Sequence, residues 1–224
     1  MNSQRKTAIV TGAGKRVGAV IARALLDDGW QVVAHVRRQG DPIPQGARKI
    51  VADLADAGCA QAILAAATGL PPVRLLVNNA ARFAWDELSA FDGVEFDSHM
   101  AVNVRAPLLL MKAFATAHDA SGDALIVNIL DAKLAAPNPD FLSYTLSKQA
   151  LAGASELAAR ALAGTGIRVN AIAPSLMLRS PGQSEDNFAE MHQANPLRRG
   201  VEPADVVAAL RYLIAARSVT GQVL

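Results

Sequence analysis

The most informative segment for the fold is Ala8-Ile9-Val10-Thr11-Gly12-Ala13-Gly14-Lys15-Arg16-Val17-Gly18, near the start of the 224-residue chain. Its apolar, β-branched beginning is typical of a buried strand, and the apolar spacing of residues 19–26 after it is typical of a helix. Strand, glycine-rich turn and helix in this order form an anion seat, because glycines allow close backbone approach and the helix N-terminus offers free N–H groups. A glycine cluster alone can be a tight turn, but the flanking strand and helix favour dinucleotide binding.

The second expected strand, residues 31–36, ends in two arginines, Arg37 and Arg38. In a dinucleotide-binding fold an acidic residue at this place binds the adenosine ribose, whereas arginine accommodates a 2′-phosphate. Lys15 and Arg16 in the glycine turn add positive charge. A solvated basic strand end would explain one arginine, but four cations directed at one pocket favour NADPH over NADH.

Strand-like and helix-like segments alternate along the whole chain. Further strands are expected at 49–54, 73–80, 124–130 and 168–172, and helices at 60–67, 96–118, 144–163 and 203–216. Repeated β–α units with buried strands predict one α/β domain over residues 1–224, a Rossmann-type, doubly wound parallel sheet flanked by helices. Two segments are irregular: 39–48 is short where a crossover helix could lie, and 176–199 is a polar excursion expected to form a substrate loop.

Composition narrows the function classes. The chain is 51% hydrophobic, enough for a substantial core, and its net charge of +2 with 4% aromatic residues does not indicate nucleic-acid binding. The single cysteine, Cys59, is expected to be a small core residue, and four dispersed histidines predict no metal site. Without an apolar run of about 18 residues or a targeting segment, the chain is expected to be cytoplasmic and to bind no membrane.

A second informative segment is Ser143-Tyr144-Thr145-Leu146-Ser147-Lys148. A tyrosine and a lysine four residues apart lie on one face of a helix. There the ammonium group can lower the pKa of the phenol from its ordinary value of ~10 and prepare it for proton exchange. An ordinary surface helix can carry the same pair, so its weight depends on the other motifs.

Five motifs together resemble the successive signatures of the short-chain dehydrogenase/reductase family. They are Thr11-Gly12-x5-Gly18, Asn78-Asn79-Ala80, Asn103 in Asn103-Val104-Arg105-Ala106-Pro107, Tyr144-x3-Lys148 and Ala173-Pro174. The family usually has glycine at Arg16 and serine at Asp131, and both departures are similar to its pteridine reductase branch. Within that branch, the short 39–48 connection and Ile172-Ala173-Pro174-Ser175-Leu176 most resemble bacterial dihydromonapterin reductases, which reduce dihydropterins and, more weakly, dihydrofolate.

The resemblance implies an NADPH-dependent reductase in which hydride passes to C6 of a dihydropterin. Tyr144 with Asp131 would deliver a proton to the adjacent nitrogen, Lys148 would bind the nicotinamide ribose and Asn103 would hold a water behind it. The implied cofactor contacts are Gly12, Lys15, Arg16, Val17, Gly18, His35, Arg37, Arg38, Asp53, Leu54, Asn79, Ala80, Ala81, Lys148, Pro174, Ser175 and Leu176. The implied substrate contacts are Arg16, Phe83, Asp131 and Tyr144.

The assignment of a pterin depends most on Asp131 and Phe83. Carbonyl reduction needs neutral hydroxyl donors for a developing alkoxide. The carboxylate of Asp131 instead suits a substrate with several N–H donors and a ring nitrogen that gains a proton, although Asp131 could also simply anchor its loop. Phe83 is expected to stack on the pterin, with a core phenylalanine as the alternative.

Two other functions remain open at the level of sequence. One is a carbonyl-reducing member of the same family acting on a ketone or an acyl thioester, and the other is a non-catalytic NADP(H) sensor. The presence of Tyr144, Lys148 and Asn103 argues against a sensor, which has no need of them. The helix expected at 96–118 carries more apolar surface than one sheet face requires, and the resemblance implies a homotetramer.

Overall fold

The computed structural model describes residues 6–120, 122–179, 182–194 and 197–224. In these residues, six parallel strands form one sheet in the order β3-β2-β1-β4-β5-β6. The strands are β1 (Thr7–Val10), β2 (Gln31–Val36), β3 (Arg48–Val51), β4 (Val73–Asn78), β5 (Ala124–Ile129) and β6 (Ile167–Ile172). The predicted doubly wound parallel sheet is confirmed.

The register of the central strands brings the expected site residues to one edge of the sheet. Val10 of β1 pairs with Val77 of β4, and Asn78 of β4 pairs with Asn128 of β5. The ends of β1, β4 and β5 are therefore in register. The segments that follow them lie next to one another at the carboxyl ends of the strands: the glycine turn, residues 79–81 and residues 130–131. The strand order also reverses between β1 and β4, and in open α/β sheets ligands bind outside the carboxyl ends of the strands at such a point.

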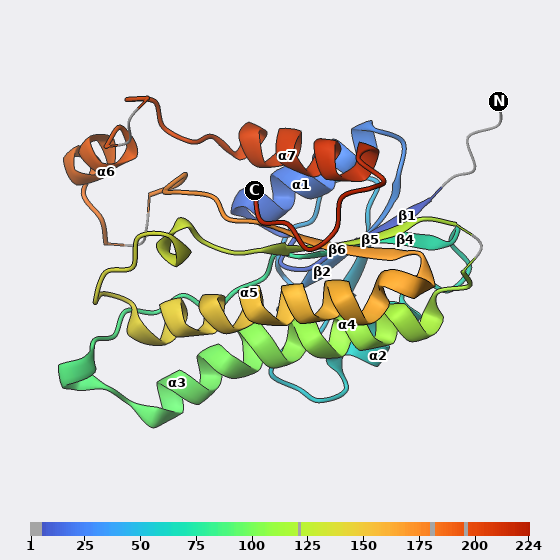
Figure 1. The fold of residues 1–224 in the computed structure, drawn as a ribbon, viewed down its shortest axis with the longest axis horizontal. Helices are drawn as coiled ribbons and strands as arrows, with labels where there is room; N and C mark the ends of the chain where they lie inside the picture. The colour runs from blue at the N-terminus through green and yellow to red at the C-terminus, as the bar shows by residue number, and fades with distance from the viewer. Residues whose placement is uncertain (1–5, 121, 180–181, 195–196) are drawn as a thin grey trace.

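Helices cover both faces of the sheet (Figure 1). One layer contains α1 (Arg16–Asp27) and α7 (Pro203–Ala215), and the other contains α2 (Cys59–Ala65), α4 (Ala106–Ala117) and α5 (Leu142–Leu162). Successive strand side chains point to opposite faces. In β1, accordingly, Ala8 and Val10 pack in the core under α1 and α7, and Ile9 packs in the core under α2 and α4. Cys59 is buried in the second core, as predicted.

The helix expected over 96–118 is not continuous. It consists of α3 (Gly93–Met100), a wider π-type turn (Ala101–Arg105) and α4. The N–H of Ala106 bonds to the carbonyl of Ala101, five residues back. Pro107 gives the reason, because it has no N–H and its ring crowds the carbonyl of Asn103 in a regular helix. The wider turn contains Asn103, and such turns occur frequently at functional sites.

The two irregular segments differ in structure. Residues 39–47 contain turns but no helix or strand, and the segment lies against the glycine turn, since a Cβ at Gly14 would be 2.8 Å from the carbonyl oxygen of Pro42. The 176–199 segment contains a helix, α6 (Glu185–His192). Single 3-10 turns are present at Leu88–Ala90, Ala132–Leu134 and Ala163–Thr165. No helix in the described part of the chain is both long and apolar enough to span a bilayer.

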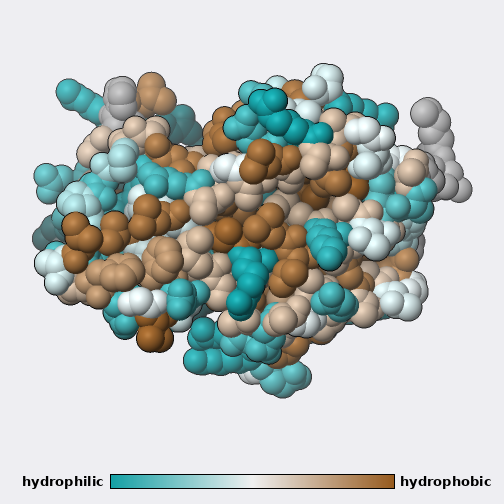
Figure 2. Space-filling model, turned by 60° about the horizontal axis from the view of Figure 1, so that its bottom comes forward, coloured by the Kyte–Doolittle hydropathy of each residue, from teal (hydrophilic) through white to brown (hydrophobic). Residues whose placement is uncertain are grey.

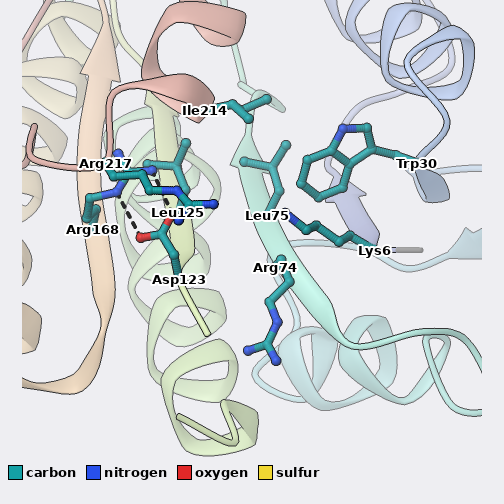
Figure 3. A pocket seen from close by; sticks show the side chains of 9 residues that line it. All are labelled: Lys6, Trp30, Arg74, Leu75, Asp123, Leu125, Arg168, Ile214 and Arg217. Atoms are coloured by element: carbon teal, nitrogen blue, oxygen red, sulfur yellow. Dashed lines mark hydrogen bonds and ion pairs between the residues drawn. The ribbon is translucent and has the colours of Figure 1, made fainter. Parts of the chain in front are cut away.

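The opposite edge of the sheet holds a small pocket between the starts of the strands (Figure 3). The guanidinium of Arg168, which is largely buried in β6, binds Asp123 through two nitrogens, at 3.1 and 3.2 Å. It also donates to the carbonyls of Leu213 and Ala216, which lie at the end of α7 and would otherwise lack helical partners. Arg168 therefore attaches α7 to the sheet, at the edge away from the glycine turn.

Candidate active site

The glycine turn is packed directly against the residues that follow β4. Gly12 has a left-handed backbone (φ +65°), and a Cβ at Gly18 would lie 2.2 Å from the Gly12 carbonyl oxygen and 2.4 Å from Asn79 Nδ2. Asn79 Nδ2 donates to the carbonyl of Thr11 at 2.8 Å, and the backbone N–H groups of Asn79 and Ala80 both donate to the Thr11 hydroxyl at 3.0 Å. Any side chain at Gly18 would separate these segments, so the turn requires glycine there.

Arg16 occupies the backbone conformation that the usual glycine would adopt. Its φ is +52°, in the left-handed region, which costs most L-residues about 1–2 kcal/mol. Its guanidinium donates to the carbonyls of Leu178 at 3.2 Å and Arg179 at 3.0 Å. Arg16 thus connects the glycine turn to the segment after β6, in which Pro174, Ser175 and Leu176 also lie.

His35 supports the glycine turn from inside the protein. Its Nδ1 accepts a hydrogen bond from the Gly12 N–H at 3.2 Å, so Nε2 carries the proton and donates to the carbonyl of Ala52 at 3.0 Å. Burial lowers the pKa of His35, which favours this neutral form. Both ring nitrogens are used within the protein, and we therefore expect His35 to position the turn.

The cations expected beside a 2′-phosphate are exposed. Arg37 and Arg38 follow β2 directly, and the backbone N–H of Arg38 donates to Asp41 at 3.0 Å. Lys15 is exposed at the start of α1. The remaining predicted cofactor contacts vary in exposure: Val17 and Ala80 are half-buried, Leu54 is buried, and Asp53 and Ala81 are exposed. Asp53 accepts a hydrogen bond from the Ala55 N–H at 2.9 Å, so its carboxylate stabilises a local turn.

Tyr144, Asp131 and Lys148 come together where β5 ends and α5 begins. The Tyr144 hydroxyl donates to Asp131 Oδ2 at 2.9 Å, and Asp131 Oδ1 accepts from the Lys133 N–H at 2.9 Å. Lys148 Nζ donates to the carbonyl of Ile129 at 2.6 Å and lies 5.6 Å from the centroid of the Tyr144 ring. Asp131 therefore contacts the phenol and also anchors its own loop, the two roles considered from the sequence.

The ionisation of this group differs from the expectation. Burial and the Asp131 carboxylate raise the pKa of Tyr144 well above its ordinary value, and burial lowers the pKa of Lys148 to about 8. The predicted lowering of the Tyr144 pKa by Lys148 is wrong for this arrangement. The phenol hydrogen bond goes to a carboxylate, which favours the neutral phenol. The phenol of Tyr144 is therefore neutral near pH 7.

Asn103 connects the loop after β4 to α5. Its Oδ1 accepts from the Arg82 N–H at 2.7 Å, and its Nδ2 donates to the Arg82 carbonyl at 3.0 Å and to the Ser147 hydroxyl at 2.9 Å. Ser147 directly precedes Lys148 in α5. Asn103 thus fixes the helix beside the lysine, and the water that it was expected to hold stays a prediction.

Three aromatic rings form one wall of the site. Phe83 is 43% exposed, so the alternative of a core phenylalanine is wrong. Its ring stacks on that of Phe141, with centroids 4.4 Å apart and an interplanar angle of 13°, and it meets the Tyr144 ring edge-on at 4.7 Å. Phe141 was not predicted from the sequence, although its place just before the helix that carries Tyr144 is a usable signal.

A comparison with known families identifies the family of this protein. A family model described as short chain dehydrogenase matches residues 6–189. The chain belongs to the short chain dehydrogenase family. Its membership makes the protein an oxidoreductase.

This short chain dehydrogenase is similar to solved FolM reductases and to curated sugar-alcohol and carbonyl oxidoreductases. The FolM alternative dihydrofolate reductases 1 from Brucella canis and Brucella suis, both solved with NADP, are each 35% identical to it. The alignment with the B. canis protein has a TM-score of 0.93 and covers 99% of this chain and 92% of that protein. The alignment with the B. suis protein has a TM-score of 0.89 and covers 97% of this chain and 92% of that protein. Galactitol 2-dehydrogenase (L-tagatose-forming) from Cereibacter sphaeroides is 32% identical over 97% of this chain and 91% of its own. Carbonyl reductase [NADPH] 2 from Sus scrofa is 30% identical over 97% and 92%.

Proposed function

We propose that the protein is an NADPH-dependent reductase of a dihydropterin, related in activity to dihydromonapterin and dihydrofolate reduction, and that residues 1–224 act as one catalytic domain. The observation that carries the proposal is the hydrogen bond from the Tyr144 hydroxyl to the carboxylate of Asp131. A carboxylate would repel the alkoxide formed in carbonyl reduction, whereas it can accept hydrogen bonds from the N–H groups of a pterin. The likeness to the two FolM structures supports the same reading.

The residues of the glycine turn fit a dinucleotide. A glycine at position 18 lets the start of α1 pack against Gly12 and Asn79, which holds the glycine turn at the N-terminus of α1. The free N–H groups of that N-terminus would bind the pyrophosphate. The proposed cofactor contacts around it are Lys15, Val17, Asn79, Ala80 and the segment from Pro174 to Leu176. The exposed guanidinium groups of Arg37 and Arg38 would bind the 2′-phosphate. When bound, NADPH supplies the hydride.

The proton comes from the side-chain group around Tyr144. For the reaction the neutral phenol would turn its single proton from Asp131 to the ring nitrogen next to C6 and transfer it there. The freed carboxylate oxygen of Asp131 would accept a hydrogen bond from an N–H group of the substrate. Lys148 would bind the nicotinamide ribose and would bring positive charge to the phenol as the proton leaves. The exposed ring of Phe83 would provide a stacking surface for the pterin. Arg16, whose guanidinium lies beside the segment that follows β6, would contact the amino-pyrimidine.

A specific observation favours a second candidate, reduction of a ketone or an acyl thioester. The curated relatives include a carbonyl reductase that matches nearly the whole chain. An NADPH-oxidation assay separates the two functions, with dihydromonapterin, dihydrobiopterin, dihydrofolate, a simple ketone and an acyl thioester as substrates. We expect turnover with at least one dihydropterin and little with the other two classes. Turnover of the ketone or thioester alone would replace the proposed function, and no turnover of any substrate would favour the sensor.

Arg38 is expected to determine the choice of cofactor. The unmodified enzyme should prefer NADPH over NADH by at least ~1–2 kcal/mol, the range for a charge-assisted contact to phosphate. Arg38→Asp should shrink or reverse the preference, because the new carboxylate repels the phosphate and can bind the free ribose diol. Arg217→Asp is the matched control, since it changes the net charge equally at the opposite edge of the sheet. The measurement is kcat/KM for both cofactors, and equal values in the unmodified enzyme would contradict the assignment.

We further propose that the protein assembles as a homotetramer through the face formed by α4 and α5. Hydrophobic side chains gather on this face (Figure 2), where Leu108 and Leu157 are 44% and 69% exposed. Apolar surface of this kind marks contacts between proteins. Light scattering at micromolar concentration should give the mass of four chains, and a monomer would exclude this assembly.

A further inference from the structure

We propose that Asp86 is a positioning residue that caps helix α5 from outside and thereby holds Tyr144 in place. The kinetic part of this inference rests on the proposed reductase function. Asp86 lies in the loop after β4 and is 5% exposed. It is absent from every motif that the sequence offers.

Asp86 receives the hydrogen bonds of the first two residues of α5. Its Oδ1 accepts from the Ser143 N–H at 3.0 Å and its Oδ2 accepts from the same N–H at 3.2 Å. The Ser143 hydroxyl also donates to Oδ2, and the backbone carbonyl of Asp86 accepts from the Leu142 N–H at 3.2 Å. Among the described residues, no lysine or arginine forms an ion pair with this buried carboxylate. Its partners are therefore the start of the helix and the serine.

The start of α5 needs a cap that its own sequence does not provide. The residue before the helix, Phe141, has a left-handed backbone (φ 57°) and makes no capping hydrogen bond with its side chain. By contrast, α3 is capped by Asp92 and α6 by Ser184, each directly before its helix. The first N–H groups of a helix lack internal partners, and a carboxylate near them interacts favourably with the helix dipole. Asp86 supplies both the acceptor and the charge for the 21 residues of α5.

The capping contact lies directly beside the reacting group. Ser143 immediately precedes Tyr144, and Phe83, three residues before Asp86, stacks on Phe141. The loop after β4 is thus joined to the start of α5 by a polar contact and by an aromatic one. Without the carboxylate, the buried N–H and hydroxyl of Ser143 lose their acceptor, which costs free energy. We therefore expect the first turn of α5 to shift. The 2.9 Å hydrogen bond from Tyr144 to Asp131 would then lengthen.

The test uses a signal from Tyr144 that requires neither cofactor nor substrate. The chain has two tyrosines, so labelling with tyrosine that carries 13C at Cζ gives one resonance for Tyr144 and one for the exposed Tyr212. In Asp86→Ala we expect the Tyr144 resonance to move toward that of Tyr212. We also expect kcat for dihydropterin reduction to fall about 10- to 100-fold, the effect of a misplaced catalytic group, while the Kd for NADPH changes less than about 2-fold.

Three further variants complete the test: two remove the capping contact only in part, and the third is the control. Asp86→Asn keeps one acceptor oxygen for the Ser143 N–H, and Ser143→Ala removes only the hydroxyl, so both should fall between wild type and Asp86→Ala. If Asp86→Ala does not fold, these two carry the test. Asp92→Ala removes a cap of the same kind from α3 and should lower the melting temperature without moving the Tyr144 resonance.

Different results would overturn the positioning role of Asp86 and the proposed reductase function. An unmoved Tyr144 resonance with wild-type kcat in folded Asp86 variants overturns the positioning role, whatever happens to the melting temperature. A moved resonance in an enzyme whose wild type reduces no dihydropterin overturns the proposed function and supports the positioning role.

Discussion

We expect Tyr144→Phe to lower dihydropterin reduction by about 10²- to 10⁴-fold, the range for loss of a group that transfers a proton in the transition state. The change removes the hydroxyl that donates to Asp131 and keeps the ring that meets Phe83 edge-on. Binding of NADPH should therefore remain, because the glycine turn and Lys148 are untouched. The measurements are kcat at saturating NADPH and the Kd for NADPH by fluorescence.

The second tyrosine of the chain provides the matched control for this experiment. Tyr212→Phe removes a hydroxyl from α7, on the other face of the sheet, and should leave kcat unchanged. Tyr144→Phe with kcat within 10-fold of wild type would assign the proton to another donor. In that case water reaching the ring nitrogen directly would be the remaining source.

Much of this fold can be predicted from short segments of the sequence. Short apolar runs predict the strands, and glycines at fixed spacing predict the turn, because each of these features depends on neighbouring residues. The interruption of the helix expected at 96–118 could also have been predicted, since Pro107 lies inside this segment. The contact of Arg16 with the carbonyls of residues 178 and 179 could not be predicted, because these residues are more than 160 positions away in the sequence.

The site was predicted less completely than the fold, for a physical reason. A motif identifies Tyr144 and Lys148 but gives neither their burial nor the direction of their hydrogen bonds. Burial and Asp131 raise the pKa of Tyr144, whereas the spacing of the pair alone predicted the reverse. Asp86 was missed because its partner Ser143 is 57 positions away, and only the fold brings the two together.

Asp131 makes two contacts, one with the Lys133 N–H and one with the Tyr144 hydroxyl, and substitutions can separate them. Asp131→Asn keeps an oxygen that can accept from the Lys133 N–H, so the turn at Ala132–Leu134 should persist and the melting temperature should change little. The carboxylate that receives the Tyr144 hydroxyl is lost. We therefore expect dihydropterin reduction to fall by about 10²-fold or more, with NADPH binding retained.

The chain contains a matched control for this substitution. Asp92 Oδ1 accepts from the Val94 N–H at 2.9 Å, the same contact over the same spacing as that of Asp131 Oδ1 with Lys133, but at the start of α3. Asp92→Asn should change the melting temperature about as much as Asp131→Asn does and leave turnover intact. The pair of variants thus measures the anchoring contribution separately from the catalytic one.

Asp131→Ser completes the experiment, because it restores the residue usual in the family. A serine offers the neutral hydroxyl that alkoxide chemistry requires, so we expect weak activity on simple ketones to rise while dihydropterin reduction stays low. Melting temperature, dihydropterin turnover and ketone turnover are measured for both variants. Full dihydropterin turnover in a folded Asp131→Asn enzyme would remove the catalytic role. A lower melting temperature with unchanged turnover per folded molecule would leave Asp131 as the anchor of its loop.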